Sequence, residues 1–284
     1  MKQIVLNFVL LLLFAPVAVT AQTSPSATGA PDGGAQSPIA NTGGAAAPKP
    51  FSRIALGGGI GLGGINLQAA VEANRYLNIR GIGNVFSYSV NNININGSGG
   101  GSGVNVSGTL NFAEAGVALD YYPWPNHGFR LSPGLTFFND NGATASGTTT
   151  PGASITLNST TYYSDSVNPF ALNASLGLNQ HKQAFTLTTG WGNMLSRKGG
   201  HWSFPFEIGA IFTGTPVVKL NLTGNACTNP ADAATNGPSC VNLATNATAQ
   251  ADIASQVAKF QKDLNALTVY PIFTFGVAYN FRIR

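Results

Sequence analysis

Few side chains in this sequence of 284 residues could carry out acid–base or nucleophilic chemistry. The three histidines, His127, His181 and His201, belong to no HExxH motif, and the chain contains no G-x-S-x-G motif. Asp140, Asp165 and His181 could supply the acid and base of a hydrolase if loops brought them together, but their spacing gives no sign of this. A hydrolase is therefore the weakest of three candidate functions, and we predict that the chain is not an enzyme.

A glycine pattern and two cysteines are the remaining candidates for a ligand site. Gly59, Gly61 and Gly64 match the G-x-G-x-x-G pattern, but no helix is expected after them, so they predict a hairpin loop. Cys227 and Cys240 are too few for a four-ligand zinc site. In an oxidising compartment they predict a disulfide, worth about 3 kcal/mol in the chain-entropy model. A redox centre is the weaker alternative because there is no CxxC, and we expect no cofactor and no metal.

The charged side chains share one face of the segments in which they lie. Seven of them fall on the polar face of an alternating segment: Glu72, Arg80, Glu114, Asp120, Arg130, Glu207 and Arg282. Acid and base alternate from one segment to the next, so they could pair across a strand spacing of about 5 Å. On a lipid-facing surface each would cost about 2–4 kcal/mol at mid-depth. We therefore expect an internal network that plugs the lumen of a small barrel, the alternative being a gate for a small solute.

The composition excludes most soluble classes of protein. Only 8% of the residues are charged, against about 25% in an average soluble domain, whereas 44% are hydrophobic. The net charge is +4, with no basic cluster beyond Arg197 and Lys198, so no nucleic-acid partner is expected. After the N-terminal segment, no apolar run reaches the length of a spanning helix. A membrane or envelope protein that crosses with strands remains.

The N-terminal 50 residues predict an export signal and a linker. Residues 1–21 resemble a secretory signal peptide, with Lys2, an apolar run from Ile4 to Phe14 and the small-residue end Val19-Thr20-Ala21. Residues 22–50 are rich in Pro, Gly, Ala, Ser and Thr, which predicts a disordered periplasmic arm. The folded domain is expected over residues 51–284.

From Phe51 onward, apolar and polar residues alternate with a period of two, which indicates half-exposed strands. We predict eight strands, at about 53–60, 65–74, 77–90, 107–123, 129–139, 174–194, 201–214 and 268–283. Short turns at 74–77, 123–128 and 196–200 alternate with long loops at 91–106, 140–173 and 215–267, and the small turn 61–64 heads the first hairpin on the same side as the long loops. This arrangement is typical of an eight-stranded antiparallel up-and-down transmembrane β-barrel with both termini in the periplasm.

Two further patterns mark the ends of the predicted barrel. Aromatic residues gather near the short turns, which predicts an interfacial girdle rather than scattered core aromatics: Tyr76, Tyr121, Trp124, Trp191 and Trp202. In the last long loop, apolar residues recur at intervals of three and four: Ile253, Val257, Phe260, Leu264 and Leu267. They predict one amphipathic helix over 249–266, whose apolar stripe is expected to pack on the loop or barrel mouth rather than to bind a partner.

Six stretches carry a family resemblance: 80–88 (RGIGNVFSY), 119–123 (LDYYP), 128–134 (GFRLSPG), 190–193 (GWGN), 202–220 and 270–282. Together they cover most of residues 51–284 and resemble the small OmpA/OmpW-type outer-membrane β-barrel family. The resemblance implies a bacterial outer-membrane location and an assembly signal in the last strand, read by the barrel-insertion machinery: Thr274, Gly276, Tyr279 and Phe281. The family's usual terminal Phe is followed here by Arg282-Ile283-Arg284.

The resemblance implies little about activity, because unrelated functions share such folds. The leading expectation is a non-enzymatic envelope protein that allows limited passage of small, apolar solutes. The second is an adhesion or envelope-stability module that acts through its extracellular loops. Outer-membrane lipid and lipopolysaccharide are the expected surroundings, and a monomer is expected.

Overall fold

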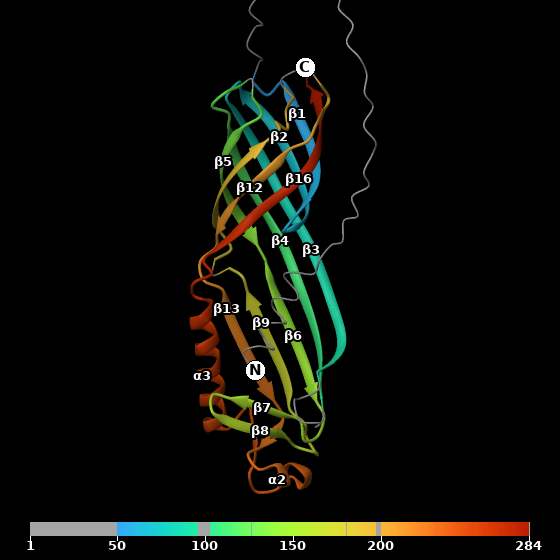
Figure 1. The fold of residues 1–284 in the computed structure, drawn as a ribbon, viewed down its shortest axis with the longest axis vertical. Helices are drawn as coiled ribbons and strands as arrows, with labels where there is room; N and C mark the ends of the chain where they lie inside the picture. Colours follow the sequence, from blue (N-terminus) through green and yellow to red (C-terminus); the bar gives the residue numbers. More distant parts are fainter. Residues whose placement is uncertain (1–49, 96–102, 126, 180, 197–199, 284) are drawn as a thin grey trace, which may run out of the picture. The chain divides into compact units, whose positions relative to one another are not determined.

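Eight antiparallel strands form a closed ring, seen in the upper half of Figure 1. The computed structural model describes residues 50–95, 103–125, 127–179, 181–196 and 200–283, so the predicted signal peptide and nearly all of the predicted arm lie outside the described residues. The ring strands are β1 (Arg53–Gly61), β2 (Gly64–Asn74), β3 (Leu77–Ile95), β4 (Val104–Tyr121), β5 (Arg130–Asn139), β10 (Ala184–Trp191), β12 (Phe206–Phe212) and β16 (Val269–Arg282). The β1–β16 and β4–β5 pairings close it.

Alternation along each ring strand separates an inner from an outer surface. On β16, the even-numbered Thr274, Ala278 and Asn280 are buried, whereas the odd-numbered Phe273, Phe275 and Val277 are exposed. Exposed apolar side chains recur on the outer surface of the other strands, among them Leu56, Ile60, Leu67, Ile79, Leu119, Leu135, Leu187 and Ile208. The period-two pattern therefore does divide the sheet into a polar inside and an apolar outside.

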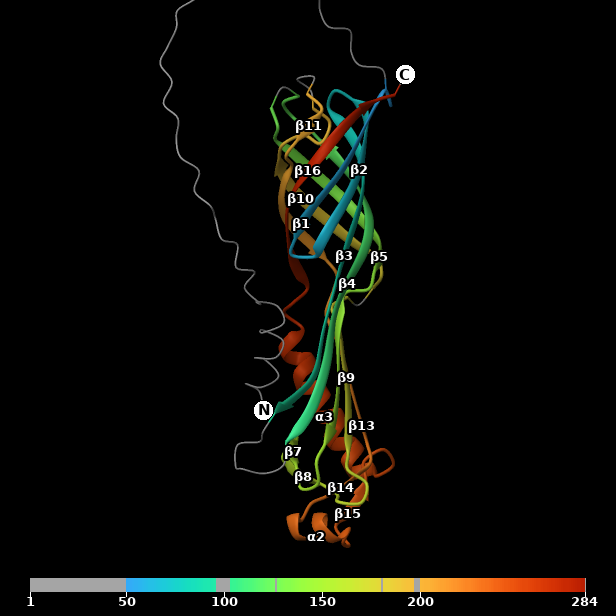
Figure 2. The same cartoon turned by 90° about the vertical axis from the view of Figure 1, so that its right-hand side faces the viewer.

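The ring has two different ends. One end, here called the turn end, carries the connections β2–β3, β4–β5 and β10–β12 and the described ends of the chain, since Arg53 pairs with Arg282. The short β11 (Trp202–Ser203) pairs with β16 there. At the opposite end, β3 and β4 continue beyond the ring, as Figure 2 shows.

These continuations belong to a second region, the extension sheet. It consists of the distal parts of β3 and β4 together with β6 (Gly142–Thr149), β9 (Ala171–Gly177) and β13 (Val217–Thr223), in the order β3-β4-β6-β9-β13. The prediction of long loops at 91–106, 140–173 and 215–267 is wrong in this respect, because parts of each range are strands. The predicted strand 174–194 is also wrong, because its two halves lie in β9 and β10. The segments predicted as loops are rich in Gly, Asn, Ser and Thr, as loops usually are. Their backbone groups are nevertheless satisfied by pairing with the edge of an existing sheet, so parts of them form strands.

A smaller four-stranded sheet adjoins the extension sheet. It contains β7 (Ser154–Leu157), β8 (Thr160–Ser164), β14 (Asn225–Cys227) and β15 (Cys240–Asn242), with the short helix α2 (Pro230–Thr235) between the last two strands. An apolar core joins these elements: Leu157, Tyr162, Phe170, Leu222, Ala226, Leu243, Ala249 and Ile253. This region therefore has a hydrophobic core separate from the polar interior of the ring.

The predicted amphipathic helix is present as α3 (Ala247–Leu264). Asn246 caps it by accepting a hydrogen bond from the backbone N–H of Ala249, and Ile253 packs into the apolar core. Gln261 accepts a hydrogen bond from the N–H of Val218 (3.2 Å) and donates one to the carbonyl of Pro216 (2.6 Å). The helix therefore packs on the extension sheet and satisfies part of the open edge of β13. Within the described residues, no helix is long and apolar enough to cross a membrane.

A tyrosine–carboxylate bond attaches α3 to β8, and it predicts a pH dependence. Tyr162 donates to Asp252 at 2.9 Å, and burial together with this bond raises the pKa of Tyr162 to about 12 from 10.0. A raised pKa in the folded state means that the stabilisation is complete below pH 10 and is lost as the pH rises through about 12. In ultraviolet titration of tyrosine ionisation, Tyr162→Phe should have one late-titrating tyrosine fewer than the unmodified protein. In Asp252→Asn, Tyr162 should titrate earlier; an unchanged late titration there would contradict the assignment.

Candidate functional site

Four buried charged side chains cross the interior of the ring, and we call them the four-charge cluster: Arg80, Asp120, Arg130 and Glu207. The Arg80 Nε donates to both oxygens of Asp120 (3.1 and 3.0 Å), while its two Nη atoms donate to Glu207 (2.6 and 3.0 Å). Arg130 donates to Glu207 at 3.0 Å and lies 3.8 Å from Asp120. Two guanidinium groups thus face two carboxylates, and their formal charges cancel.

Uncharged neighbours fix the cluster in place. Ser132 donates to Asp120 at 2.6 Å, Thr188 donates to Glu207, and Gln68 accepts from Arg80 at 3.1 Å. Gly190 stands in register between Arg130 and Glu207, and a Cβ there would lie 3.1 Å from the Arg130 guanidinium carbon. The missing side chain at Gly190 therefore leaves the space through which Arg130 reaches Glu207.

The remaining predicted lumen charges lie on either side of this cluster. Glu72 is buried and binds Arg53 through two hydrogen bonds of 2.7 and 2.8 Å. Glu114 is half-buried and accepts hydrogen bonds from the amides of Asn84 and Asn141 (3.2 Å for Asn141). Most of the predicted set thus lies inside the ring.

Arg282 does not belong to this interior set. It is exposed at the end of β16, opposite Arg53. In the alternation along β16, however, its position is one that faces inward, as Ala278 and Asn280 do. The ring ends at this point, so the position opens to solvent. Arg53, which the sequence analysis did not select, takes the place beside Glu72; its parity with buried Ala55 is the signal that could have identified it.

Residues 192–196 fold into the turn end of the ring, which the sequence analysis did not predict. Met194 and Leu195 are fully buried against Ala55, Ala70 and Ala278. The carbonyl of Gly192 accepts a 2.6 Å bond from Arg130, and that of Ser196 accepts a 2.8 Å bond from Arg53. This segment therefore closes the turn end, and two lumen arginines hold it there.

Two small cavities lie inside the ring. One, of about 40 Å³, lies beside Glu207 and Glu114 and has a polar rim of Asn66, Gln68 and Thr188. The other, of about 10 Å³, lies between Arg130 and Met194. One water needs roughly 10–15 Å³ of such space, so these cavities hold a few waters and no larger solute. The interior is suited to packing and not to ligand binding.

The predicted girdle residues all lie at the turn end with exposed or largely exposed rings: Tyr76, Tyr121, Trp124, Trp191 and Trp202. Phe129 bridges Trp124 and Trp191, with ring centroids 5.9 and 6.1 Å apart. Trp202 packs edge-on to Tyr279 of the predicted assembly signal at 4.9 Å, and Tyr279 contacts Phe281 at 4.8 Å. Thr274 and Gly276, the other two residues of that signal, face inward on β16. Their roles in the membrane and in assembly stay predictions.

The structure does not assemble the residues considered for a hydrolase. Asp140 and His181 are exposed in connections near the ring, where Asn179 donates both to the carbonyl of Asn139 and to that of His181. Asp165 is buried beside the small sheet, directly after the C-terminal end of β8. The buried carboxylates of the ring are paired with guanidinium groups, which makes them poor general acids.

The predicted disulfide between Cys227 and Cys240 is confirmed, and it links β14 to β15. Cys227 is fully buried. We expect thiol labelling of the folded protein to be negligible before reduction and to reach two groups per chain after reduction and denaturation. Ready labelling without a reductant would contradict the bridge, and a Cys227→Ser/Cys240→Ser variant gives the background.

Comparison with known proteins gives only a loose structural likeness. No protein-family model matches the chain, and no curated protein matches it. Two solved structures, the crystal structures of Acinetobacter baumannii CarO and CarO2, are 17% and 16% identical over 82% and 81% of this chain and 98% of theirs, each with a TM-score of 0.47. At this TM-score the likeness carries no argument about function. The resemblance to the OmpA/OmpW-type family therefore stays a prediction.

Proposed function

We propose that the chain is a non-enzymatic anchor of the bacterial outer membrane. In this proposal the ring is an eight-stranded up-and-down transmembrane β-barrel, with its turn end and both termini in the periplasm. The extension sheet, the small sheet and α3 stand outside the cell. The barrel holds them there as an adhesion or envelope-stability module, which is the second of the functions predicted from the sequence.

The outer surface of the ring supports the membrane location. The apolar outward residues of β16 run from Val269 to Phe281, about 41 Å along the strand and about 29 Å along the normal at a tilt of 45°. This is close to the apolar band of about 25 Å on outer-membrane barrels. On β4 the outward residues change from apolar at Val117 and Ala113 to polar at Thr109 and Ser107. The change falls where β3 and β4 leave the ring, as expected at a membrane surface.

The filled interior of the ring is the observation that favours an anchor over a channel. The four-charge cluster crosses the ring, residues 192–196 close the turn end, and the two cavities inside the ring have room only for waters. Passage of a solute would require breaking several buried charged hydrogen bonds at once. These contacts favour the anchor over limited solute passage, and no paired acid and base in the described residues favours a hydrolase.

A variant that keeps the ring and lacks the extension tests this proposal. Each removed segment is replaced by an Asn-Gly turn between residues paired in the ring: Phe86 with Phe112, Thr136 with Ala184, and Phe212 with Val269. We expect this variant to assemble in the outer membrane but to lose cell adhesion or resistance to envelope stress. Both proteins should give little conductance in planar bilayers. Steady, large conductance from the unmodified protein would contradict the anchor. So would full cell adhesion and full resistance to envelope stress in the variant that lacks the extension.

A further inference from the structure

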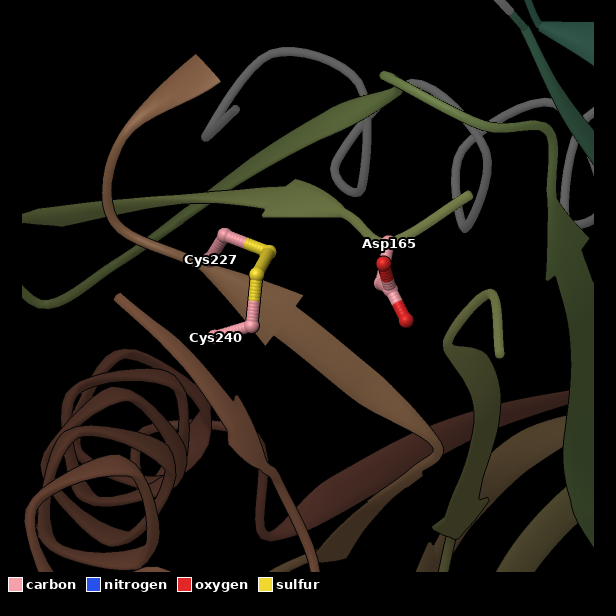
Figure 3. Close-up of side chains that lie close together, drawn as sticks. All are labelled: Asp165, Cys227 and Cys240. Atoms are coloured by element: carbon pink, nitrogen blue, oxygen red, sulfur yellow. A yellow bond between two sulfur atoms is a disulfide. The ribbon is translucent and has the colours of Figure 1, made fainter. Parts of the chain in front are cut away.

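Three side chains that can bind metal ions meet in the small sheet. Asp165 follows β8, Cys227 ends β14 and Cys240 begins β15, as Figure 3 shows. One carboxylate oxygen and the two sulfur atoms all lie within 4.8 Å of one another. The three residues come from separate segments of the chain, so the fold itself brings them together.

The carboxylate of Asp165 has an unused ligand atom. The residue is fully buried, and its Oδ2 accepts a 3.1 Å hydrogen bond from the N–H of Asn168. Its Oδ1 is buried without a hydrogen-bond partner among the described residues. A buried carboxylate oxygen in this state costs free energy that a cation or a donor would recover. The feature is therefore unexplained by the packing of the small sheet alone.

We propose that this site binds a thiophilic divalent cation, such as Zn²⁺, when the disulfide is reduced. A dithiol reductant gives two electrons and two protons to the disulfide, leaving two thiols and itself becoming a disulfide. Zn²⁺ then displaces both thiol protons and is held by two thiolates and the Asp165 carboxylate, with water in the fourth position. The disulfide and the metal exclude each other, because bonded sulfurs are not thiolates.

The geometry suits this ligand set. Zinc binds sulfur at about 2.3 Å and carboxylate oxygen at about 2.0–2.2 Å, so tetrahedral ligands lie roughly 3.4–3.8 Å apart. The three ligand atoms already lie within 4.8 Å of one another, and binding requires the two sulfurs to part after reduction and the carboxylate to close in. Backbone bonds that do not involve the disulfide hold the three segments: Asp165 N–H to Asn225 (3.3 Å) and Cys240 N–H to Gly237 (3.0 Å). Cys240 is only half-buried and lies on an edge strand, which gives the ion a route in.

Cobalt titration of the full chain in detergent tests the proposal. The disulfide is reduced with a phosphine, which takes up oxygen from water as a phosphine oxide, and the reductant is removed without air. Co²⁺ added to the reduced protein should give one thiolate-to-cobalt charge-transfer band at one ion per chain, and Zn²⁺ should abolish it. The oxidised protein should give no band. Reduced unmodified protein that binds no Co²⁺ would overturn the proposal.

Variants separate the carboxylate from the thiols. Cys240→Ser should lose the band, and Asp165→Asn, which keeps the shape of the side chain, should weaken Co²⁺ binding at least tenfold. Asp263→Asn, on the exposed side of α3, should bind as the unmodified protein does. Mass measurement of the Asp165→Asn disulfide before reduction checks that the small sheet has folded. Unchanged affinity in folded Asp165→Asn would show that two thiols alone bind the ion and would overturn the three-ligand site.

Discussion

Replacing Glu207 with glutamine should destabilise the folded ring by about 3–5 kcal/mol, because it leaves a buried positive charge without its partner. Glu207 accepts hydrogen bonds from Arg80 (2.6 and 3.0 Å), Arg130 (3.0 Å) and Thr188. In the variant, two buried guanidinium groups would share the single carboxylate of Asp120. Urea unfolding in detergent, followed by the heat-modifiable mobility of the folded protein, measures the loss.

A second substitution serves as the control for this effect. Arg130→Gln added to Glu207→Gln restores the balance of charge, leaving Arg80 paired with Asp120. We expect the double variant to be more stable than the sum of the two single losses predicts, by 1 kcal/mol or more. Strictly additive losses, or a Glu207→Gln ring as stable as the unmodified one, would show that the four-charge cluster is not a coupled unit.

Replacing Phe275 with arginine should block assembly into the membrane. Phe275 is 52% exposed at the middle of β16, with Phe206 and Ile60 directly opposite on the two neighbouring strands. An arginine at the bilayer midplane costs about 2–4 kcal/mol, and Phe206→Arg should act in the same way. The folded fraction in outer-membrane preparations, read from heat-modifiable mobility, measures the result.

The matched control is Thr144→Arg, which places the same side chain on the exposed polar face of the extension sheet. It should assemble normally, since the position lies beyond the apolar band. A substitution at Ser132 would be a poor control, because the Ser132 hydroxyl is buried and donates a hydrogen bond to Asp120. A normal folded fraction in both phenylalanine variants would mean that this surface does not face lipid.

The ring was predictable because its pattern is local and repeated. Alternation with a period of two, as between Val269 and Phe281, assigns each strand and its inner face without knowledge of its partners. The inward position of Glu72, Arg80 and Glu207 follows from the same parity. Their mutual contacts do not, since the bonds from Arg80 to Glu207 cross the ring between strands far apart in sequence.

The extension sheet and residues 192–196 were not predictable for different reasons. β6 (GATASGTT) is rich in Gly, Ala and Thr and has no large apolar residue, so it becomes a strand because β4 and β9 offer it an edge. β13 (VVKLNLT) does alternate, but it is a single short run inside a segment assigned to a loop. Met194 and Leu195 show no periodicity, and only the closed ring gives them a space to fill. The exposure of Arg282 depends on where the ring stops, which alternation alone does not specify.

The long β3–β4 pairing, which changes register once, between Val90 and Ile93, has a mechanical consequence for an anchored module. Register pairs run from Leu77 opposite Tyr121 in the ring to Ile95 opposite Val104 in the extension sheet, about 60 Å at the usual rise per residue. A force pulling the extension outward would act along these strands and load their hydrogen bonds in shear, many at a time. Because both strands are continuous from the ring into the extension sheet, tension on the extension sheet passes along them into the wall of the ring.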